Sequence, residues 1–127
     1  MRRPESLHEA ARRMNATIKM GRVAHDALSY HMSDFRHALK GKNAEWVQQA
    51  IDKEPDKVTD LIDAWLGGCA EYLALREGLP VPAWVEDPSR FLQKEVYWCS
   101  KSVFMAGLVN TPPPWLRRKM ICEEPEL

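Results

Sequence analysis

The chain has 127 residues, of which 45 % are hydrophobic and 28 % are charged, and its formal net charge at pH 7 is zero. This composition excludes wholesale disorder, and a domain of this length buries roughly two-thirds of the surface that its unfolded chain exposes. The zero net charge argues against a large generic affinity for nucleic acid or for an anionic membrane. We therefore expect one folded domain that spans residues 1–127.

The charges are unevenly distributed along the chain. Residues 1–55 carry ten Lys or Arg and seven Asp or Glu, a net charge of +3, and residues 56–127 carry the opposite net charge. This asymmetry is too small to identify a partner. It does allow a basic N-terminal arm, which consists of Arg2, Arg3, Arg12 and Arg13.

The cysteines indicate a reducing compartment. Cys69, Cys99 and Cys122 are odd in number, far apart and without the CxxC spacing of zinc and redox sites. No apolar run follows the N-terminus as in a signal peptide, and no stretch approaches the roughly 18 apolar residues of a membrane span. We expect a cytoplasmic protein.

Two helices are predicted in the first 40 residues. The run Ser6-Leu7-His8-Glu9 has the form of a capping box and starts a helix that ends near Gly21. A second amphipathic segment covers about 22–40, and Gly41 is a plausible left-handed stop. The apolar stripe of each helix is narrow, so the two helices can pair within one chain or across a homodimer.

Three histidines fall in the second predicted helix, namely His25, His31 and His37. A spacing of six residues places them on different faces, whereas metal ligands at i and i+4 would share a face. We expect packed or solvated histidines and no metal site.

A third helix is predicted over about 43–53, with Asn43 as its N-cap. The segment 37–51 could be a helix-turn-helix, because a glycine separates two short amphipathic helices. A helix-turn-helix would need apolar packing residues beside that glycine, but lysines flank it. We therefore favour a plain helical hairpin and keep DNA binding as the alternative. The candidate nucleic-acid contacts are Arg2, Arg3, Arg12, Arg13, Lys40 and Lys42.

The long central segment, about 56–77, predicts the main helix of the domain. Pro55 and Asp56 favour its start, and apolar residues follow a 3.6-residue period to its end at Gly78. Gly67 and Gly68 each cost about 1 kcal/mol in a helix interior, which leaves a break as the competing possibility. The apolar stripe keeps its phase across the pair, so we predict one continuous helix with a neighbour packed closely on its small-residue side.

Prolines dominate the chain after this helix. Pro80 and Pro82 predict an extended strap over the core, and Asp87 with Pro88 predicts a new helical start. A further helix is expected over about 100–110, a turn or short helix over 115–120, and a frayed acidic tail over 122–127. The predicted fold is a single compact all-α domain of five to seven helices around 56–77, with Pro-rich irregular straps in its C-terminal half.

Three parts of the C-terminal half form one pattern. They are the segment EYLALREGLPVPAWVEDPSRFL, Trp98 and the segment LVNTPPPWLRRKMI. Over residues 71–121 it resembles the C-terminal module of poorly characterised bacterial antitoxin-like or regulatory proteins, whose pattern is GLPVPAW, DPSRFL, a tryptophan and LVxTPxPFxRRxIFI. The chain departs from that pattern in carrying Trp115 where phenylalanine is common, and in the acidic residues that follow Ile121. The resemblance implies an antitoxin-like protein whose partner is a toxin encoded alongside.

The sequence contains no Gly-rich phosphate loop and no GxSxG nucleophile, and capping explains most carboxylates. Arg3 and His8 have the Arg-x4-His spacing of a ribonuclease pattern in some helical toxins, so a small helical RNase-like toxin is kept as a further alternative. We expect a protein with no catalytic residues and no cofactor.

The C-terminal half of the chain is rich in Trp, Tyr and Arg. These residue types are enriched in interface hot spots, which favours a binding protein. The candidate partner-binding residues are Trp115, Arg117, Arg118, Trp84 and Arg90. Trp115 follows three prolines and precedes two arginines, so we predict an exposed anchor there, and we expect Trp84 and Trp98 to fill the core. The predicted function is a non-catalytic, cytoplasmic protein-interaction protein, the antitoxin-like member of a toxin-antitoxin pair, with a DNA-binding transcriptional regulator as the alternative.

Overall fold

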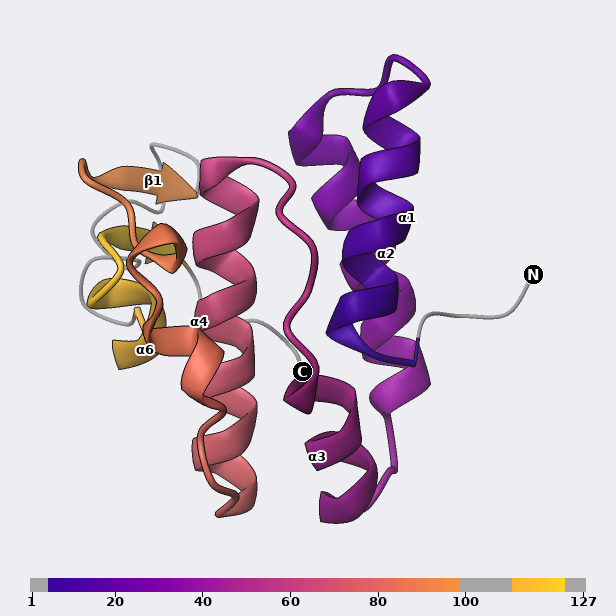
Figure 1. Cartoon of the computed structure of the whole chain (residues 1–127), viewed down its shortest axis with the longest axis vertical. Coiled ribbons are helices and arrows are strands. Elements are labelled where there is room, and N and C mark those ends of the chain that lie inside the picture. The colour runs from indigo at the N-terminus through magenta and orange to yellow at the C-terminus, as the bar shows by residue number, and fades with distance from the viewer. Residues whose placement is uncertain (1–4, 99–110, 123–127) are drawn as a thin grey trace.

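The computed structural model describes residues 5–98 and 111–122 of the chain (Figure 1). Within these ranges the elements are, in chain order, α1 (Leu7–Lys19), α2 (Ala24–Leu39), α3 (Ala44–Asp52), α4 (Asp60–Glu77), the 3₁₀ helices η1 (Ala83–Glu86) and η2 (Pro88–Arg90), β1 (Val96–Trp98), α6 (Pro113–Leu116) and β2 (Met120–Cys122). The prediction of a compact all-α fold is confirmed. The helix expected over 100–110 and the tail beyond Cys122 lie outside the described residues.

Helices α1 and α2 form an antiparallel hairpin, the right-hand part of Figure 1. The predicted cap is present, since Ser6 Oγ accepts a hydrogen bond from the Glu9 backbone N–H at 3.0 Å. The turn between the helices uses Gly21 at φ 95°, a conformation that favours glycine. The apolar stripes of the two helices are buried against each other, and α1 also packs against α3.

Helix α3 follows α2 after a turn at Gly41, which has φ 76°. Asn43 is its N-cap, as predicted, and its side-chain oxygen accepts the Trp46 backbone N–H at 3.0 Å. The buried side of α3 consists of Val47, Ala50 and Ile51. Its exposed side consists of Glu45, Gln49 and Asp52.

The start of the central helix differs from the prediction. Helix α4 begins at Asp60 instead of near residue 56, because Thr59 is its N-cap and accepts the Ile62 backbone N–H at 3.2 Å. The Asp63 carboxylate closes the same turn by accepting the Val58 backbone N–H at 2.8 Å. Reciprocal bonds of this kind fix where a helix starts more firmly than a proline several residues upstream.

The prediction of an unbroken helix through Gly67 and Gly68 is confirmed, and α4 ends at Gly78 with φ 67°. The helix is buried from Ile62 to Glu71, with α3 on one side and η1, η2 and α6 on another (Figure 1). Helix α4 therefore lies between α3 and the C-terminal segment and contacts both. No helix in the described ranges combines the length and the apolar character needed to cross a membrane.

A short parallel strand pair lies in the C-terminal segment and was not predicted. Val96 pairs with Met120 and Trp98 with Cys122 in a two-stranded sheet. Parallel neighbours need a crossover of a dozen or more residues, so they leave no local hairpin signal in the sequence. Lys119, with φ 66°, makes the turn that leads into β2.

Candidate functional site

One face of α4 carries two buried carboxylates on either side of a glycine. Asp63, Gly67 and Glu71 follow at four-residue steps and therefore lie in one row along the helix. The two acidic residues are only 5 % and 8 % exposed. A Cβ at Gly67 would lie 3.0 Å from Arg118 Nε and 3.1 Å from Arg90 Cβ, so the glycine gives two arginines room to approach the helix.

Glu71 is held by both arginines of the C-terminal pair. Arg118 donates from Nη1 at 2.8 Å, and Arg117 donates from Nε at 2.9 Å and from Nη2 at 2.6 Å. Burial raises the pKa of the Glu71 carboxyl, but these hydrogen bonds outweigh it and leave the pKa below its usual value. Arg118 is fully buried, which lowers its pKa, and it also donates to the carbonyls of Pro114 and Val85.

Arg90 occupies the other end of the row and is also fully buried. Its Nη2 donates to the Pro55 carbonyl at 2.6 Å and to the Glu54 carboxylate at 3.1 Å, and its Nη1 lies 3.7 Å from Asp63 Oδ1. Burial raises the pKa of Asp63, and this effect exceeds the lowering by the Val58 N–H and by Arg90. Arg90 thus connects the segment before α4 to the helix itself.

The prediction that Trp115 is an exposed anchor is wrong. Trp115 is fully buried against α4, where its indole N–H donates to the Trp65 carbonyl at 3.2 Å. Its ring centroid lies 5.6 Å from that of Trp65 and 5.1 Å from that of Tyr72. Gly68 makes room for the indole on this side of α4, because a side chain at that position would collide with the ring.

Two other predicted partner-binding residues, Arg90 and Arg118, likewise lie inside the protein. Arg117 keeps 39 % of its side chain exposed, and Trp84 is half-buried with its indole N–H donating to the Ile51 carbonyl at 3.0 Å. A role of Arg117 and Trp84 in partner binding stays a prediction. We name the buried group the clamp, which consists of Asp63, Glu71, Arg90, Trp115 and Arg118.

The spacing of the acidic residues in α4 is a sequence signal for the clamp. Acidic residues spaced four residues on either side of a glycine in an apolar helix are unusual, because a carboxylate is rarely buried without a cationic partner. That spacing points to arginines elsewhere in the chain.

The basic residues predicted to contact nucleic acid are distributed over separate places. Arg12 is exposed on α1, Arg13 pairs with Glu9 at 3.1 Å, and Arg2 and Arg3 lie outside the described residues. Lys40 and Lys42 are exposed in the turn between α2 and α3.

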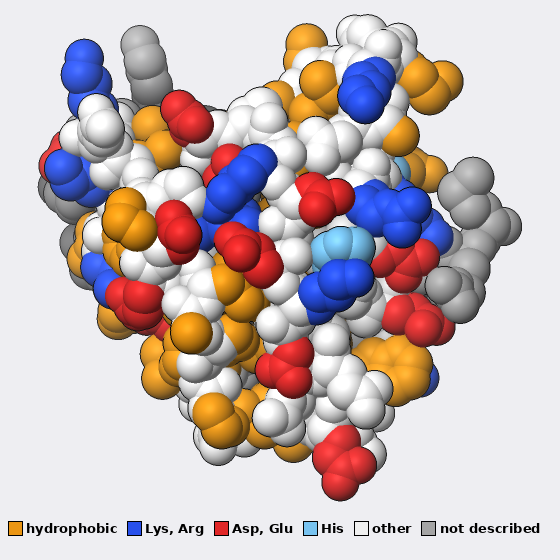
Figure 2. Space-filling view, viewed as in Figure 1, with side chains coloured by type: hydrophobic (Ala, Val, Ile, Leu, Met, Phe, Trp, Pro, Cys, Tyr) orange, Lys and Arg blue, Asp and Glu red, His pale blue; other side chains and the backbone are white. Residues whose placement is uncertain are grey.

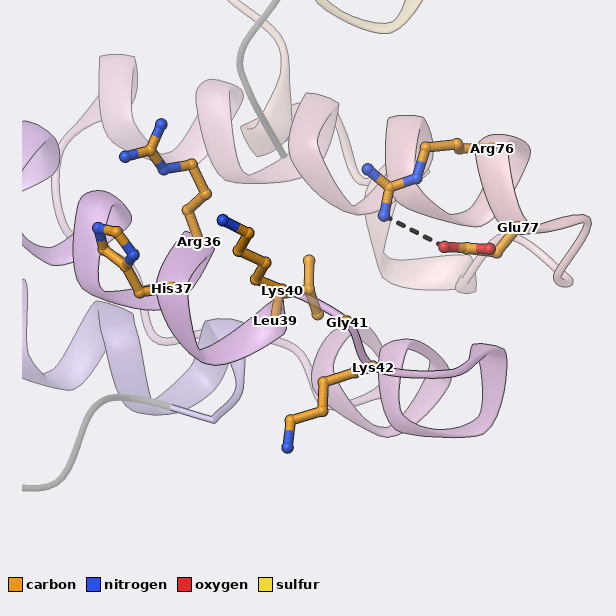
Figure 3. A pocket seen from close by; sticks show the side chains of 8 residues that line it. All are labelled: Arg36, His37, Leu39, Lys40, Gly41, Lys42, Arg76 and Glu77. Atoms are coloured by element: carbon orange, nitrogen blue, oxygen red, sulfur yellow. Dashed lines mark hydrogen bonds and ion pairs between the residues drawn. The ribbon is translucent and has the colours of Figure 1, made fainter.

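These two lysines line a hollow of about 670 Å³ that opens between the ends of α2 and α4 (Figure 3). Its lining residues are Arg36, His37, Leu39, Lys40, Gly41, Lys42, Arg76 and Glu77. We name it the basic hollow. The structure therefore brings two of the predicted lysines together with two arginines that the sequence analysis did not select.

The tip of the α1–α2 hairpin carries exposed apolar side chains that the sequence analysis missed. Met20 is 85 % exposed, Val23 61 % and Tyr30 64 %, and hydrophobic side chains gather at this end of the molecule in Figure 2. A hollow of about 680 Å³ lies beside them, lined by Thr17, Met20, Arg22, Asp26 and Tyr30. The available signal was the position of Met20 and Val23 in a turn, where polar residues are usual.

The histidines of α2 have different environments. His25 and His37 are exposed, whereas His31 is buried and its Nε2 lies 2.7 Å from Thr17 Oγ1. Burial lowers the pKa of His31, and its Nδ1 has no hydrogen-bond partner. Among the residues that the structure describes, no three His, Cys, Asp or Glu side chains are grouped as metal ligands would be.

Comparison of the chain with protein-family models, with curated proteins and with solved structures found no match. Within the described residues, three features bear on function, namely the clamp, the apolar hairpin tip and the basic hollow.

Proposed function

We propose that the chain is a protein-interaction protein and that its partner binds the apolar tip of the α1–α2 hairpin. The observation that carries the proposal is the exposure of Met20, Val23 and Tyr30 at one end of the molecule. Exposed apolar side chains leave water on association, and this burial is the main favourable contribution to most protein interfaces. Tyrosine is also among the residue types that dominate interface energies.

The rim of this surface supports a protein partner. Arg22 and Asp26 line the hollow beside the apolar residues, so a positive and a negative group border an apolar centre. Such a polar rim around an apolar core is the usual arrangement of protein interfaces. The burial of Trp115, Arg90 and Arg118 supports placing the proposed interface on the hairpin tip and not on these three residues.

The finer role that we propose is that of the antitoxin-like member of a cytoplasmic, two-component bacterial module, which neutralises its partner by covering part of its surface. Its support is the resemblance carried by residues 71–121. In this proposal the C-terminal module builds the domain, and the hairpin tip contacts the partner.

The test is co-expression with the product of the neighbouring gene, followed by affinity measurement on the purified complex. Tyr30→Glu places a charge in the apolar centre and should weaken the complex at least about tenfold. Leu75→Ser is the matched control, because Leu75 is 59 % exposed but lies on α4. The proposal is contradicted if no complex forms, or if Leu75→Ser weakens the complex as much as Tyr30→Glu does. Circular dichroism should show that both variants keep the wild-type helix content.

DNA binding is the second candidate function, and the basic hollow is the observation that favours it. The exposed side of α3, however, carries Glu45 and Asp52, which would repel phosphates if α3 lay in a groove. A DNA complex of this protein would therefore use the α2–α3 turn and not α3 as a recognition helix. A gel shift with the protein's own upstream DNA at physiological salt, in the absence of a protein partner, tests this candidate.

A further inference from the structure

We propose that His31 is a pH-sensitive switch of the hairpin tip, whose protonation loosens the tip and weakens partner binding. The inference rests on the proposed function, because it assigns a regulation to the surface on which that function places the partner. The hollow beside the tip, which we name the tip hollow, is lined by Thr17, Met20, Arg22, Asp26 and Tyr30.

His31 contacts two of the residues that line the tip hollow, one from each helix of the hairpin. Its Nε2 lies 2.7 Å from Thr17 Oγ1 on α1, and its ring centroid lies 5.0 Å from that of Tyr30 on α2 in an edge-to-face arrangement. The Thr17 carbonyl also accepts the Arg22 backbone N–H at 3.3 Å, so Thr17 is part of the turn that forms the tip. A movement of the His31 ring therefore changes the surroundings of both Thr17 and Tyr30.

The site of His31 accommodates a neutral ring. His31 is only 7 % exposed, and its Nδ1 is buried without a hydrogen-bond partner among the described residues. A neutral imidazole carries one N–H and one lone pair, so either tautomer can keep the hydrogen bond with Thr17. A protonated imidazole carries two N–H groups, and its Nδ1–H would be a buried, charged donor without an acceptor. Burying such a group is costly, so a charged ring has to turn toward water.

The charged groups that face His31 come from both helices of the hairpin and act in opposite directions. Arg13 of α1 disfavours protonation of the ring, whereas Asp34 of α2 favours it. Burial has the largest effect and lowers the pKa of His31 below its usual value of 6.5. The packed hairpin therefore holds the ring neutral at pH 7, and acidification acts against this packing.

A partner on the hairpin tip should strengthen the preference for a neutral ring. By covering the tip hollow, the partner removes the water that a charged ring would reach after turning. The complex then takes up a proton at His31 less readily than the free chain does. Protonation and partner binding oppose each other, so the affinity should fall as the pH falls below about 6.5. One proton can change an affinity by at most about tenfold per pH unit.

The experiment compares pH 7.5 with pH 5 for the wild-type chain, His31→Gln and His25→Gln. Glutamine keeps a hydrogen-bonding side chain but does not take up a proton in this range. His25→Gln is the matched control, because His25 is an exposed histidine of α2 whose Nδ1 lies 3.9 Å from Asp26 Oδ1 at the tip hollow. Each chain is measured alone by NMR and in complex with the product of the neighbouring gene by calorimetry.

In the free chain, the methyl signals of Met20 and Val23 should change together with the protonation of the His31 ring. They should do so in the wild-type chain and in His25→Gln but not in His31→Gln. In the complex, the wild-type and His25→Gln affinities should be at least about threefold weaker at pH 5 than at pH 7.5. The His31→Gln affinity should show no such loss.

The outcomes separate the switch from the proposed function. Tip signals that do not follow the protonation of His31 overturn the switch, whether or not a complex forms. Equal wild-type affinity at the two pH values overturns the regulation and leaves the proposed function intact, and so does a loss that persists in His31→Gln but disappears in His25→Gln. The absence of any complex at pH 7.5 contradicts the proposed function and, with it, the regulation of binding.

Discussion

Gly68 and Trp115 fit each other so closely that a single methyl group on the glycine would collide with the indole. An added Cβ would lie 2.6 Å from Trp115 Cδ1, well inside normal contact distance. The glycine that weakens α4 as an isolated helix is therefore what allows the C-terminal segment to pack on it. This relationship explains the glycine at position 68 of the longest described helix, and the approach of Arg90 and Arg118 explains the one at position 67.

We predict that Gly68→Ala destabilises the protein by about 1–3 kcal/mol, because the overpacking against Trp115 exceeds the gain of about 1 kcal/mol in helix propensity. Gly67→Ala should cost less, since the nearest atoms lie at 3.0 and 3.1 Å and need to give way by less than the indole at 2.6 Å from Gly68. Urea denaturation of both variants measures the difference. Equal stability of Gly68→Ala and the wild-type protein would show that the indole moves freely.

The sequence predicts the elements of this fold better than their contacts. The caps at Ser6 and Asn43, the continuity of α4 and its end at Gly78 all follow from local signals, and the structure confirms them. These features depend on residues within one or two helical turns of each other. Local sequence patterns are therefore sufficient to identify them.

The contacts of the C-terminal segment depend on residues far apart in the chain. Trp115 packs against Trp65, which lies 50 positions earlier, and the partners of Glu71 follow it by 46 and 47 positions. A tryptophan between prolines and arginines is typical of an interface hot spot. The same residues can also be buried in the core when the tryptophan packs against a helix face that carries a glycine. The sequence shows the types of residue but not which surface they meet.

Replacing Glu71 should be costly, because it leaves the fully buried Arg118 without a charged partner. We expect Glu71→Gln to lower the free energy of unfolding at pH 7 by about 3–5 kcal/mol. Glu9→Gln is the control, since it removes the charge from the more exposed Arg13 pair and should cost less than about 1 kcal/mol. Chemical denaturation at pH 7 measures both. Similar losses in the two variants would contradict the assigned role of the clamp.

The Glu71 contribution should also depend on pH. Because the pKa of Glu71 is lower in the folded state, its stabilising effect is present above the usual value of 4.5 and is lost as the pH falls through the folded-state pKa. The stability difference between the wild-type protein and Glu71→Gln should therefore shrink below about pH 4.5. A difference that stays constant from pH 7 to pH 3 would show that the carboxylate is not stabilised by its arginines.

As the pH is lowered, the loss of stability caused by His31 should begin at a higher pH than the loss caused by Glu71. Burial lowers its pKa below the usual 6.5, so the unfolded state binds a proton more readily than the folded state. Its contribution is complete above pH 6.5 and is lost as the pH falls through the folded-state pKa. Thermal unfolding between pH 7.5 and 5 should show this loss in the wild-type protein and less of it in His31→Gln. The exposed His37→Gln variant should retain the wild-type slope.

The most direct test of the proposed function is hydrogen–deuterium exchange of the free chain and of its complex with the product of the neighbouring gene. The proposal places the partner on the hairpin tip, so exchange should slow in residues 17–30 on complex formation. The segment 111–122 should keep its exchange rate, because its tryptophan and Arg118 are already buried against α4. Slowed exchange in 111–122 with no change in 17–30 would contradict the account and return the interface to the C-terminal module.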